Sequence, residues 1–333
     1  MNQSIASVTI AYNGARMLPR QMDALLAQAR TLQEIVVVDN ASSDGTAAML
    51  AQRYPQVTVL RMKENAGAAG AWARGLSYAA LEKRHDWVWS FDDDSVPNSF
   101  VLANLLDGIG SLNGTQSEVG IVAPMPVHQK TGTCYPPLLW QNGFVRPSAN
   151  HMQTPLWFAD LIIASGCLVR REVVAKIGLP RADFFMDFFD YEYSLRARSN
   201  GYKIAVIPNA ELDHEIGNAR KVWAGRSRLW TSYAPWREYY NTRNMAYAGW
   251  HLYPNIETKQ FVLGHLARHA GAVLLFSPEK AACLRKMAQG FWDGCRAKLG
   301  IRFTPNGQPH HGENGATPQS AQVLAENHHL RIP

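Results

Sequence analysis

The chain has 333 residues, of which 47% are hydrophobic and 18% are charged. This length corresponds to about two domains, or to one large α/β domain with an appendage, and the composition supports a sizeable hydrophobic core and excludes a wholly disordered chain. Its 33 Lys and Arg residues exceed its 27 Asp and Glu residues by six, a formal charge of +6 that permits an anionic partner without selecting one.

Short apolar or β-branched runs alternate with helical patterns over residues 1–124. They predict strands at residues 5–11, 34–39, 57–62, 87–91 and 119–123. Apolar side chains at helical spacing predict helices at residues 18–29, 46–54, 71–83 and 100–108. This alternation predicts an α/β fold with a Rossmann-like, mostly parallel sheet flanked by helices.

The pattern is less regular after residue 124. Residues 125–158 are rich in Pro, Gly and aromatic residues and predict loops or a hairpin. Beyond them we expect strands at 160–169 and 203–207, and helices at 171–178, 187–199, 236–250, 257–276 and 278–299. The polar end of the chain predicts disorder. We therefore divide the chain at 1–124, 125–234, a C-terminal helical region at 235–302 and a tail at 303–333.

The cysteine spacing and the lengths of the apolar runs indicate the cellular compartment. The four cysteines form no closely spaced pair, which argues against a structural zinc site and a disulfide framework. The N-terminal residues lack the basic and apolar regions of a signal peptide, and no apolar run approaches the roughly 20 residues that cross a bilayer. We therefore expect a cytoplasmic protein. No nucleic-acid-binding module accompanies the positive charge, so we expect no nucleic acid partner.

Polar side chains follow four of the predicted strands. A single such group is ordinary turn chemistry, but the carboxyl ends of parallel strands meet at one edge of a sheet, where ligands bind. The four groups therefore predict one shared site. They are Tyr12 and Asn13, then Asp39, then Lys63 and Asn65, and finally Asp92, Asp93 and Asp94.

The acidic triplet at residues 92–94 indicates the ligand chemistry. Three successive carboxylates repel one another, and a divalent cation relieves that repulsion. Oxygen ligands of this kind suit Mg²⁺ or Mn²⁺ bridging a diphosphate, whereas the structural alternative is an Asp-rich turn that caps the next helix. Residues 12–16 lack the G-x-G-x-x-G pattern, and the chain has no P-loop, which disfavours a dinucleotide dehydrogenase and a P-loop enzyme.

Four segments together resemble the nucleotide-binding half of inverting family 2 glycosyltransferases, a family with the GT-A fold and a DXD-type acidic motif. The segments are VTIAYNG at 8–14, IVVVDNASSDGT at 35–46, the N-x-G-x-x-G segment at 65–70 running into Arg74-Gly75, and FDDDSVP at 91–97. The resemblance implies a GT-A fold with a C-terminal helical appendage. It makes residues 1–124 the nucleotide-sugar half and residues 125–234 the acceptor half of one domain.

The same resemblance implies the roles of the site residues. Asp39 would read a pyrimidine base, with Tyr12 and Asn13 near it. Asn65 and Arg74 would lie around the nucleotide. The ribose or donor sugar would contact Asp92 and Asp93, and the metal would be held by Asp92 and Asp94.

Two features bear on the donor sugar. Trp72 and the complete Asp triplet look like the galactofuranosyltransferase branch of the family, whereas rhamnosyltransferases more often show a variant of the triplet. The implied donor is UDP-galactofuranose, with dTDP-rhamnose as the next choice.

An acidic segment at 184–196 supplies the candidate catalytic residues. Aromatic residues flank Asp190, and their partial desolvation of its carboxylate would raise its pKa, which suits a general base. Glu192 and Arg196, four residues apart, also fit an ordinary helical ion pair. The segment resembles the family's acceptor-side motif, which implies that Asp190 deprotonates the acceptor hydroxyl and that Glu192 is the acid following it.

A histidine follows the predicted strand at 203–207. A lone histidine is more often a packing or surface residue, but the resemblance implies that His214 is a metal ligand beside Asp94. Residues 239–244 also resemble a segment of rhamnosyl- and galactofuranosyltransferases. The resemblance therefore runs over roughly residues 5 to 250.

The helices beyond residue 250 combine apolar positions with positive charge. Apolar residues cluster at 261–266 and 273–276, and six Lys and Arg residues lie within 280–302. Such a surface fits peripheral contact with an anionic membrane, where lipid-linked acceptors are found. It equally fits a helical pair that covers the sheet or joins a second copy of the chain as a homo-oligomer.

These observations favour a metal-dependent inverting glycosyltransferase of surface polysaccharide biosynthesis. It would move a sugar from a UDP or dTDP sugar to a hydroxyl of a growing, lipid-linked glycan. A sugar-1-phosphate nucleotidyltransferase would need a Gly-rich basic loop after the first strand, which residues 12–16 do not supply. A non-catalytic nucleotide-sugar or glycan-binding protein would not need Asp190 and His214 beside the Asp triplet.

Overall fold

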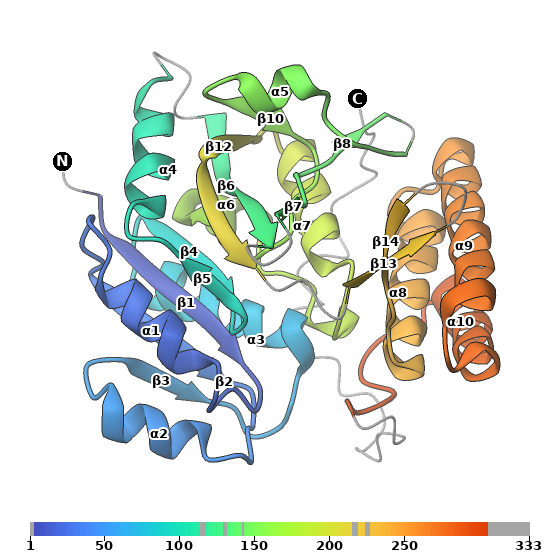
Figure 1. Ribbon diagram of the computed structural model, residues 1–333, viewed down its shortest axis with the longest axis horizontal. Helices are drawn as coiled ribbons and strands as arrows, with labels where there is room; N and C mark the ends of the chain where they lie inside the picture. Colours follow the sequence, from blue (N-terminus) through green and yellow to red (C-terminus); the bar gives the residue numbers. More distant parts are fainter. Residues whose placement is uncertain are drawn as a thin grey trace. The chain divides into compact units, whose positions relative to one another are not determined.

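The computed structural model describes residues 3–112, 118–128, 132–141, 143–214, 219–223 and 227–305. These residues form two units (Figure 1). One consists of Met1–Ala182 and Asp190–Ile216, and the other of Asp183–Phe189 and Gly217–Pro333. The expected disordered tail lies, from residue 306 onward, outside the described residues.

A mixed β-sheet forms the centre of the first unit (Figure 1). Four neighbouring strands are parallel: β3 (Thr58–Arg61), β2 (Glu34–Asp39), β1 (Ile5–Ala11) and β4 (Trp87–Asp92). The sheet continues through β11 (Leu168–Arg170), β6 (Val119–His128), β12 (Lys203–His214) and β10 (Trp157–Ala159). Of these, β11 and β10 are antiparallel to their neighbours, while β12 is parallel to β6. The short strands β5 (Ser95–Pro97) and β7 (Thr133–Cys134) pair with β12 and β6.

Helices flank this sheet. They are α1 (Leu18–Leu26), α2 (Thr46–Arg53), α3 (Gly67–Leu76) continuing into the π-helix η1 (Ser77–Glu82), α4 (Val101–Gly110), α6 (Arg171–Ile177) and α7 (Phe189–Ser199). A short hairpin of β8 (Leu139–Trp140) and β9 (Phe144–Val145) and the helix α5 (Ala149–Gln153) lie between β7 and β10 in the chain. At Gly75 of α3 a Cβ would overlap the side chain of Val8, so this glycine permits the close approach of α3 to β1.

The predicted strand at residues 160–169 is wrong over most of its length. The chain pairs as β10 before it and as β11 only from Leu168 onward. Gly166 has a φ of +81°, and the Cys167 N–H donates back to the carbonyl of Ala164, so this stretch turns instead of extending. The predicted helix at 187–199 begins two residues late, because Asp187 and Phe188 have φ values of +59° and +65°.

The second unit contains the expected C-terminal helices. β13 (Ala219–Trp223) and β14 (Ser227–Thr231) form an antiparallel pair, followed by α8 (Pro235–Tyr247) with its π-helical end η4 (Ala248–Leu252), α9 (Ile256–Phe276) and α10 (Lys280–Cys295). Gly290 and Gly294 let α10 lie against the backbone of α8, because a Cβ at either position would overlap it. In the part of the chain that the structure describes, no helix is long and apolar enough to span a bilayer.

Candidate active site

Hydrogen bonds join the loops that follow β1 and β2. The Asn13 N–H donates to Ser42 Oγ over 2.9 Å, and the Ser43 N–H donates to Asn13 Oδ1 over 2.9 Å. Asn13 has a φ of +56°, a conformation that Asn tolerates better than most residues. Tyr12 beside it remains 36% exposed. The structure therefore places Tyr12 and Asn13 at the carboxyl end of β2, as expected for neighbours of Asp39.

Asp39 is fully buried at the end of β2. Its Oδ1 accepts a hydrogen bond from the Ser42 N–H at 2.9 Å, and Arg61 Nε lies 3.8 Å from its Oδ2. Among the described residues Oδ2 has no hydrogen-bond donor. Because a buried acceptor without a donor is costly, this oxygen is suited to an N–H group supplied by a ligand.

The loop after β3 joins the same network. Asn65 Oδ1 accepts hydrogen bonds from Asn40 Nδ2 at 3.0 Å and from the Gly67 N–H at 2.8 Å. In return, Asn40 Oδ1 accepts from the Ala66 N–H at 2.9 Å. Asn65 thus lies at the carboxyl ends of the strands, at the start of α3, as the sequence predicts.

Arg74 lies elsewhere. Its Nη1 is 2.7 Å from Glu82 Oε1, and its guanidinium lies over the ring of Tyr78. The hydroxyl of Tyr78 donates to Glu34, the first residue of β2, whereas Asp39 is the last. The structure therefore places Arg74 near the opposite ends of the strands and does not bring it together with the other predicted donor-binding residues.

Asp93 folds back onto the loop after β1. Its carboxylate accepts from the Tyr12 N–H, and its Oδ2 would lie 3.0 Å from a Cβ at position 14, where the chain has Gly14. Burial raises the pKa of Asp93, and the negative charges of Asp94 and Asp92 raise it as well, so that it reaches about 7 against the lowering effect of the Tyr12 N–H. The loop after β4 is thereby joined to the other strand ends.

Asp92, Asp94 and His214 form a candidate metal site. One ligand atom from each residue lies within 4.8 Å of the others. His214 Nε2 is 3.2 Å from Asp94 Oδ1 and 3.8 Å from Asp92 Oδ2. Burial alone would lower the pKa of His214, but its contact with Asp94 and the nearby carboxylates outweigh burial and raise it.

The donor set fits a divalent cation. His214 Nδ1 is buried and has no hydrogen-bond partner among the described residues, and the buried Asp94 Oδ1 faces His214 Nε2 without a well-formed hydrogen bond. Two carboxylates with one imidazole suit Mn²⁺ or Mg²⁺ better than a soft metal. The structure thus brings together the three residues that the sequence predicts as metal ligands.

A buried polar network supports the acidic triplet, and the sequence analysis did not predict it. Gln21 Nε2 donates to the carbonyls of Asp92 and Ser95, both over 2.6 Å. Ser165 Oγ accepts from the Asp92 N–H at 3.1 Å and lies 2.7 Å from Ser95 Oγ. A glutamine among the apolar residues on the buried face of α1 was the available sequence signal for Gln21.

Asp190 is the second residue of α7. Its Oδ1 accepts from the Tyr191 N–H at 2.9 Å, and its carbonyl accepts from Ser194 Oγ at 2.7 Å. The thiol of Cys167 is close enough to both Asp190 and Asp92 for the two carboxylates to act on its pKa. Burial raises the pKa of Cys167, and the charges of both Asp190 and Asp92 raise it further, so both carboxylates lie in its surroundings.

Glu192 is buried against Arg196, with Arg196 Nη2 at 2.9 Å from Glu192 Oε2. Arg196 also donates to the carbonyls of Ile177 and Leu179, at 2.7 Å and 3.1 Å. The carboxylate of Glu192 is therefore held by a cation within its own helix, one of the two arrangements that the sequence allowed.

Trp72 connects three elements around α7. Its Nε1 donates to Ser90 Oγ of β4 at 2.7 Å, and its ring meets Tyr193 of α7 edge to face at 5.2 Å. All of its surface is buried. Trp72 thereby helps to fix α7 and its first carboxylate relative to the sheet.

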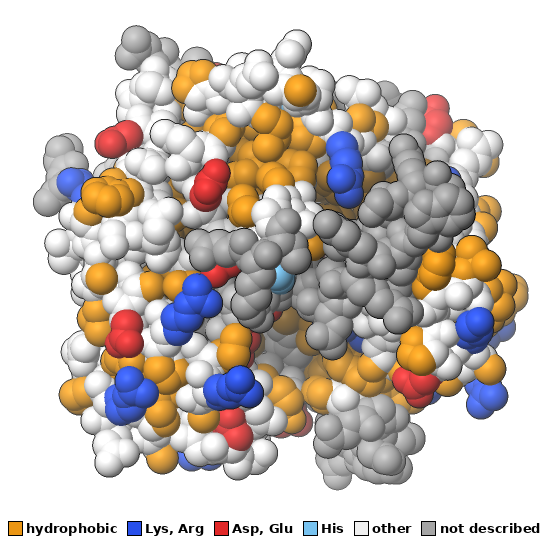
Figure 2. Space-filling view, in the orientation of Figure 1, with side chains coloured by type: hydrophobic (Ala, Val, Ile, Leu, Met, Phe, Trp, Pro, Cys, Tyr) orange, Lys and Arg blue, Asp and Glu red, His pale blue; other side chains and the backbone are white. Residues whose placement is uncertain are grey.

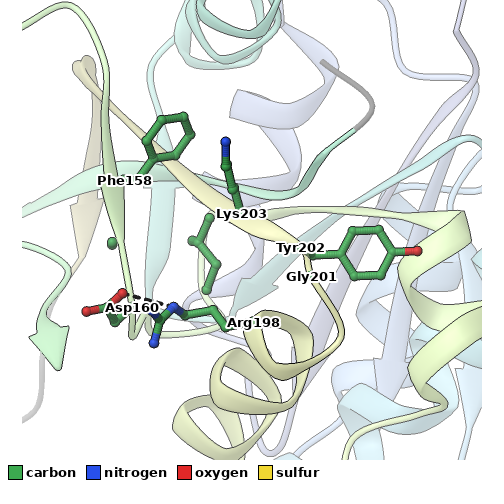
Figure 3. Close-up of a pocket in the computed structure, with 8 residues that line it drawn as sticks. Phe158, Asp160, Arg198, Gly201, Tyr202 and Lys203 are labelled. Carbon is green, nitrogen blue, oxygen red and sulfur yellow. Dashed lines mark ion pairs between the residues drawn. The ribbon is translucent and has the colours of Figure 1, made fainter. Parts of the chain in front are cut away.

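A pocket of about 270 Å³ lies apart from these residues (Figure 3). Phe158, Asp160, Arg198, Tyr202 and Lys203 line it, at β10, the end of α7 and the start of β12. Figure 3 shows Asp160 and Arg198 as an ion pair, with 2.9 Å between their charged atoms. The pocket contains none of the predicted site residues.

Comparison with known proteins identifies sequence relatives. A family model described as "Glycosyltransferase like family 2" matches residues 3–233. The chain is 27% identical over 250 residues to the dTDP-rhamnosyl transferase RfbF of Shigella flexneri, covering 73% of this chain and 79% of that protein. It is 27% identical over 259 residues to the galactofuranosyltransferase GlfT1 of Mycobacterium tuberculosis, covering 74% and 82%. An N-acetylglucosaminyl-diphospho-decaprenol L-rhamnosyltransferase of the same species is 22% identical over 236 residues, covering 64% and 76%.

Two solved structures have a similar fold. GalNAc-T7 with UDP, GalNAc and Mn²⁺ aligns with a TM-score of 0.53 and 16% identity over 63% of this chain, which corresponds to 43% of that chain. S. aureus TarS 1-349 in complex with UDP-GlcNAc aligns with a TM-score of 0.52 and 15% identity, covering 88% of this chain and 82% of the other. At such low identities these likenesses show the fold alone.

Proposed function

Because the chain belongs to glycosyltransferase family 2, we propose that it transfers a sugar from a pyrimidine nucleoside diphosphate to a hydroxyl group, with inversion at the anomeric carbon. Its GT-A fold with C-terminal helices and its enzyme class are as the sequence predicted. A nucleotidyltransferase and a non-catalytic binding protein are set aside by this family membership.

The observation that carries the proposal is the cluster of Asp92, Asp94 and His214 beside the other strand ends. In the proposed complex, Asp39 accepts a hydrogen bond from the pyrimidine through its buried Oδ2, and Tyr12 covers the base. Asn65 and Asp93 line the path from the base to the metal ligands. We do not extend this role to Arg74, because its ion pair with Glu82 occupies its guanidinium at the far ends of the strands.

The residues Asp92, Asp94 and His214 would hold Mn²⁺ or Mg²⁺. When bound, the cation would supply positive charge that neutralises the leaving diphosphate. The chain's own residues orient this site: Gln21 and Ser165 each make one hydrogen bond to the backbone of Asp92, and Gln21 makes another to the carbonyl of Ser95.

Asp190 is the proposed general base. Its carboxylate takes the proton from the acceptor hydroxyl while the acceptor oxygen attacks the anomeric carbon on the face opposite the diphosphate. The bond to the diphosphate breaks in the same displacement, so the configuration inverts and no covalent sugar–enzyme intermediate forms. Glu192, paired with Arg196, stabilises the first turn of α7 and so supports Asp190 rather than contacting the reacting atoms.

The relatives guide the choice of donor and acceptor. The names of two of them specify galactofuranosyl and dTDP-rhamnosyl transfer. We therefore propose UDP-galactofuranose as donor, with dTDP-rhamnose as the next choice. Another relative is named for an acceptor with a lipid diphosphate, and we propose a hydroxyl of a lipid-linked glycan as the acceptor here.

A thermal-shift panel tests the proposal. UDP-galactofuranose, dTDP-rhamnose and GDP-mannose are each added with and without Mn²⁺. A ligand at 100 times its Kd stabilises the folded state by about 2.7 kcal/mol, so binding raises the Tm measurably. We expect stabilisation by a pyrimidine nucleotide sugar, strengthened by Mn²⁺. The Mn²⁺ effect should disappear in Asp94→Asn and persist in Asp107→Asn, which removes an exposed carboxylate on α4. Stabilisation by GDP-mannose alone would overturn the assignment of the base.

A further inference from the structure

Residues Asp183–Phe189, here called the pre-base segment, directly precede Asp190. Although Ala182 and Asp190 on either side group with the first unit, the pre-base segment groups with the C-terminal helices. Three of its non-glycine residues have left-handed backbones, namely Phe185 at φ +63°, Asp187 at φ +59° and Phe188 at φ +65°. Each of these conformations is disfavoured for a residue with a Cβ. The segment therefore needs interactions from elsewhere in the chain to hold it.

Two side chains of α8 supply hydrogen bonds to its carbonyl groups. Asn244 Nδ2 lies 2.9 Å, 2.7 Å and 2.9 Å from the carbonyl oxygens of Phe184, Met186 and Asp187. Arg243 Nη2 donates to the carbonyls of Asp183 at 3.1 Å and of Phe184 at 2.8 Å. These side-chain donors replace the backbone partners that a regular helix or strand would provide.

Both donors are themselves fixed. Arg243 and Asn244 have no exposed surface. Arg243 Nε donates to Asn244 Oδ1 at 2.9 Å, and Arg243 Nη1 donates to the carbonyl of Gly300 at 2.6 Å. These partners orient the two side chains that donate to the pre-base segment. The two side chains thereby hold the segment at one position.

A third residue of α8 holds the segment by charge. Arg237 makes a two-pronged ion pair with Asp187, in which Nε lies 2.9 Å from Oδ2 and Nη2 lies 2.7 Å from Oδ1. The apolar side of the segment is anchored as well. Phe185 is buried among Tyr239, Tyr240 and Phe303, with its ring 4.7 Å from that of Tyr240.

We propose that Arg237, Arg243 and Asn244 are positioning residues for Asp190. They hold Phe185, Asp187 and Phe188 in their left-handed conformations, and the bond from Phe189 to Asp190 then sets the direction in which the backbone enters Asp190. This inference rests on the proposed role of Asp190 as general base.

Four variants test the proposal in the full-length chain. Arg237→Gln removes the ion pair, Asn244→Asp replaces the amide donor with a carboxylate, and Arg237→Lys keeps the positive charge. Arg268→Gln is the matched control, because it removes one exposed cation of the same unit on α9. Turnover is followed as release of nucleoside diphosphate from whichever of UDP-galactofuranose and dTDP-rhamnose stabilises the protein. Water and a panel of octyl glycosides serve as acceptors, and calorimetry gives the donor Kd.

We expect Arg237→Gln and Asn244→Asp to lower turnover per donor-binding site about tenfold or more, because small displacements of a catalytic group are costly. The donor Kd should stay within about twofold of the native value, and the acidic limb of the turnover–pH profile should move. Arg237→Lys should recover most of the turnover. A purely structural role would reduce the number of binding-competent molecules without moving the pH profile of those that remain.

Other outcomes separate the two proposals. If Asp190→Asn abolishes turnover while folded Arg237→Gln behaves like Arg268→Gln, the positioning role is wrong and the general base stands. If Asp190→Asn retains turnover, the proposed function fails and the positioning role fails with it. If Asn244→Asp does not fold, Arg237→Gln decides, because its side chain is 36% exposed and its loss leaves the buried pair of Arg243 and Asn244 intact.

Discussion

Position 14 has little room for any side chain larger than hydrogen. A Cβ there would lie 3.0 Å from Asp93 Oδ2 and 3.2 Å from Leu18 Cγ. Gly14 thus permits the carboxylate of Asp93 to fold over the loop that follows β1. The close approach of Asp93 to the loop after β1 depends on the absence of a Cβ at position 14.

We predict that Gly14→Ala displaces Asp93 and weakens donor binding about tenfold, which corresponds to about 1.4 kcal/mol. Titration calorimetry with UDP and Mn²⁺ measures the effect. Gly110→Ala is the matched control, because a Cβ at that position meets nothing within 4 Å. Equal affinities in the two variants would show that Asp93 does not depend on Gly14.

Asp190→Asn should remove the general base without changing the shape of α7, because the amide oxygen still accepts from the Tyr191 N–H. Turnover should fall by about 10² to 10⁴, the contribution typical of general-base catalysis. The donor Kd should stay within about twofold, as measured by calorimetry. Asp107→Asn serves as the control, and native-like turnover in Asp190→Asn would reject the assignment.

At the scale of single elements, α9 contains a histidine that opposes folding in acid. Burial, together with the nearby charges of His269 and Arg268, lowers the pKa of His265 to about 4. The unfolded chain, with an ordinary histidine pKa near 6.5, therefore takes up this proton first as the pH falls. Stability from His265 is complete above about pH 6.5 and is lost progressively as the pH falls toward about 4.

We predict that proton uptake at His265 lowers the free energy of unfolding by about 2 kcal/mol between about pH 6.5 and pH 5. The change follows from about 1.36 kcal/mol per pH unit for one proton. Urea unfolding at the two pH values measures the change. His265→Gln should reduce the slope of the free energy of unfolding against pH by the contribution of about one proton. His251→Gln, which alters an exposed histidine of η4, should leave it unchanged. Identical slopes in native protein and His265→Gln would contradict the prediction.

The elements of residues 1–124 could be predicted because each strand is a short apolar run bounded by turn residues. The strand predicted at 160–169 failed because periodicity does not report backbone dihedrals, and Gly166 reverses the chain within an apolar run. The late start of α7 has the same cause at Asp187 and Phe188. A left-handed backbone at residues with a Cβ is imposed by distant partners, here on α8, and leaves no local signal.

Some residues of the candidate site could likewise be predicted from the sequence and others could not. Asp92 and Asp94 could be placed from the sequence because they carry recognisable ligand chemistry at a strand end, whereas His214 was placed beside them only by the resemblance to family 2 glycosyltransferases. The position of Arg74 could not be read from the sequence, because residue 74 lies in the last turn of α3 and its ion pair with Glu82 depends on how that helix continues. Gln21 went unpredicted because it occupies a position where the helical pattern calls for an apolar side chain.

At the scale of the whole chain, the C-terminal helices present large apolar side chains to solvent. Leu275 is 70% exposed and Trp292 is 58% exposed, and Leu263 and Leu274 are also exposed. Hydrophobic side chains and the lysines and arginines of α9 and α10 lie at the surface together (Figure 2). Contact with an anionic lipid layer would use both kinds of side chain: each cation would contribute about 1 kcal/mol, and the apolar side chains would contribute by burial.

We predict that the protein co-sediments with phosphatidylglycerol vesicles at low salt and is released at high salt, because salt screens the attraction. Leu275→Glu should weaken binding, whereas Leu26→Glu, which changes an exposed leucine of α1, should not. Equal binding to neutral phosphatidylcholine vesicles would exclude an electrostatic contribution. A dimer in analytical ultracentrifugation that Leu275→Glu disrupts, with no vesicle binding, would assign the surface to a second copy of the chain.

The pre-base segment also limits how this protein can be recombined with its relatives. A chimera that exchanges only residues after 234 would separate Arg237, Arg243 and Asn244 from the seven residues that they hold. An active chimera should therefore require that residues 183–189 and α8 be exchanged together, although they are separate in the sequence. Among homologues, substitutions at position 187 should accordingly accompany substitutions at position 237.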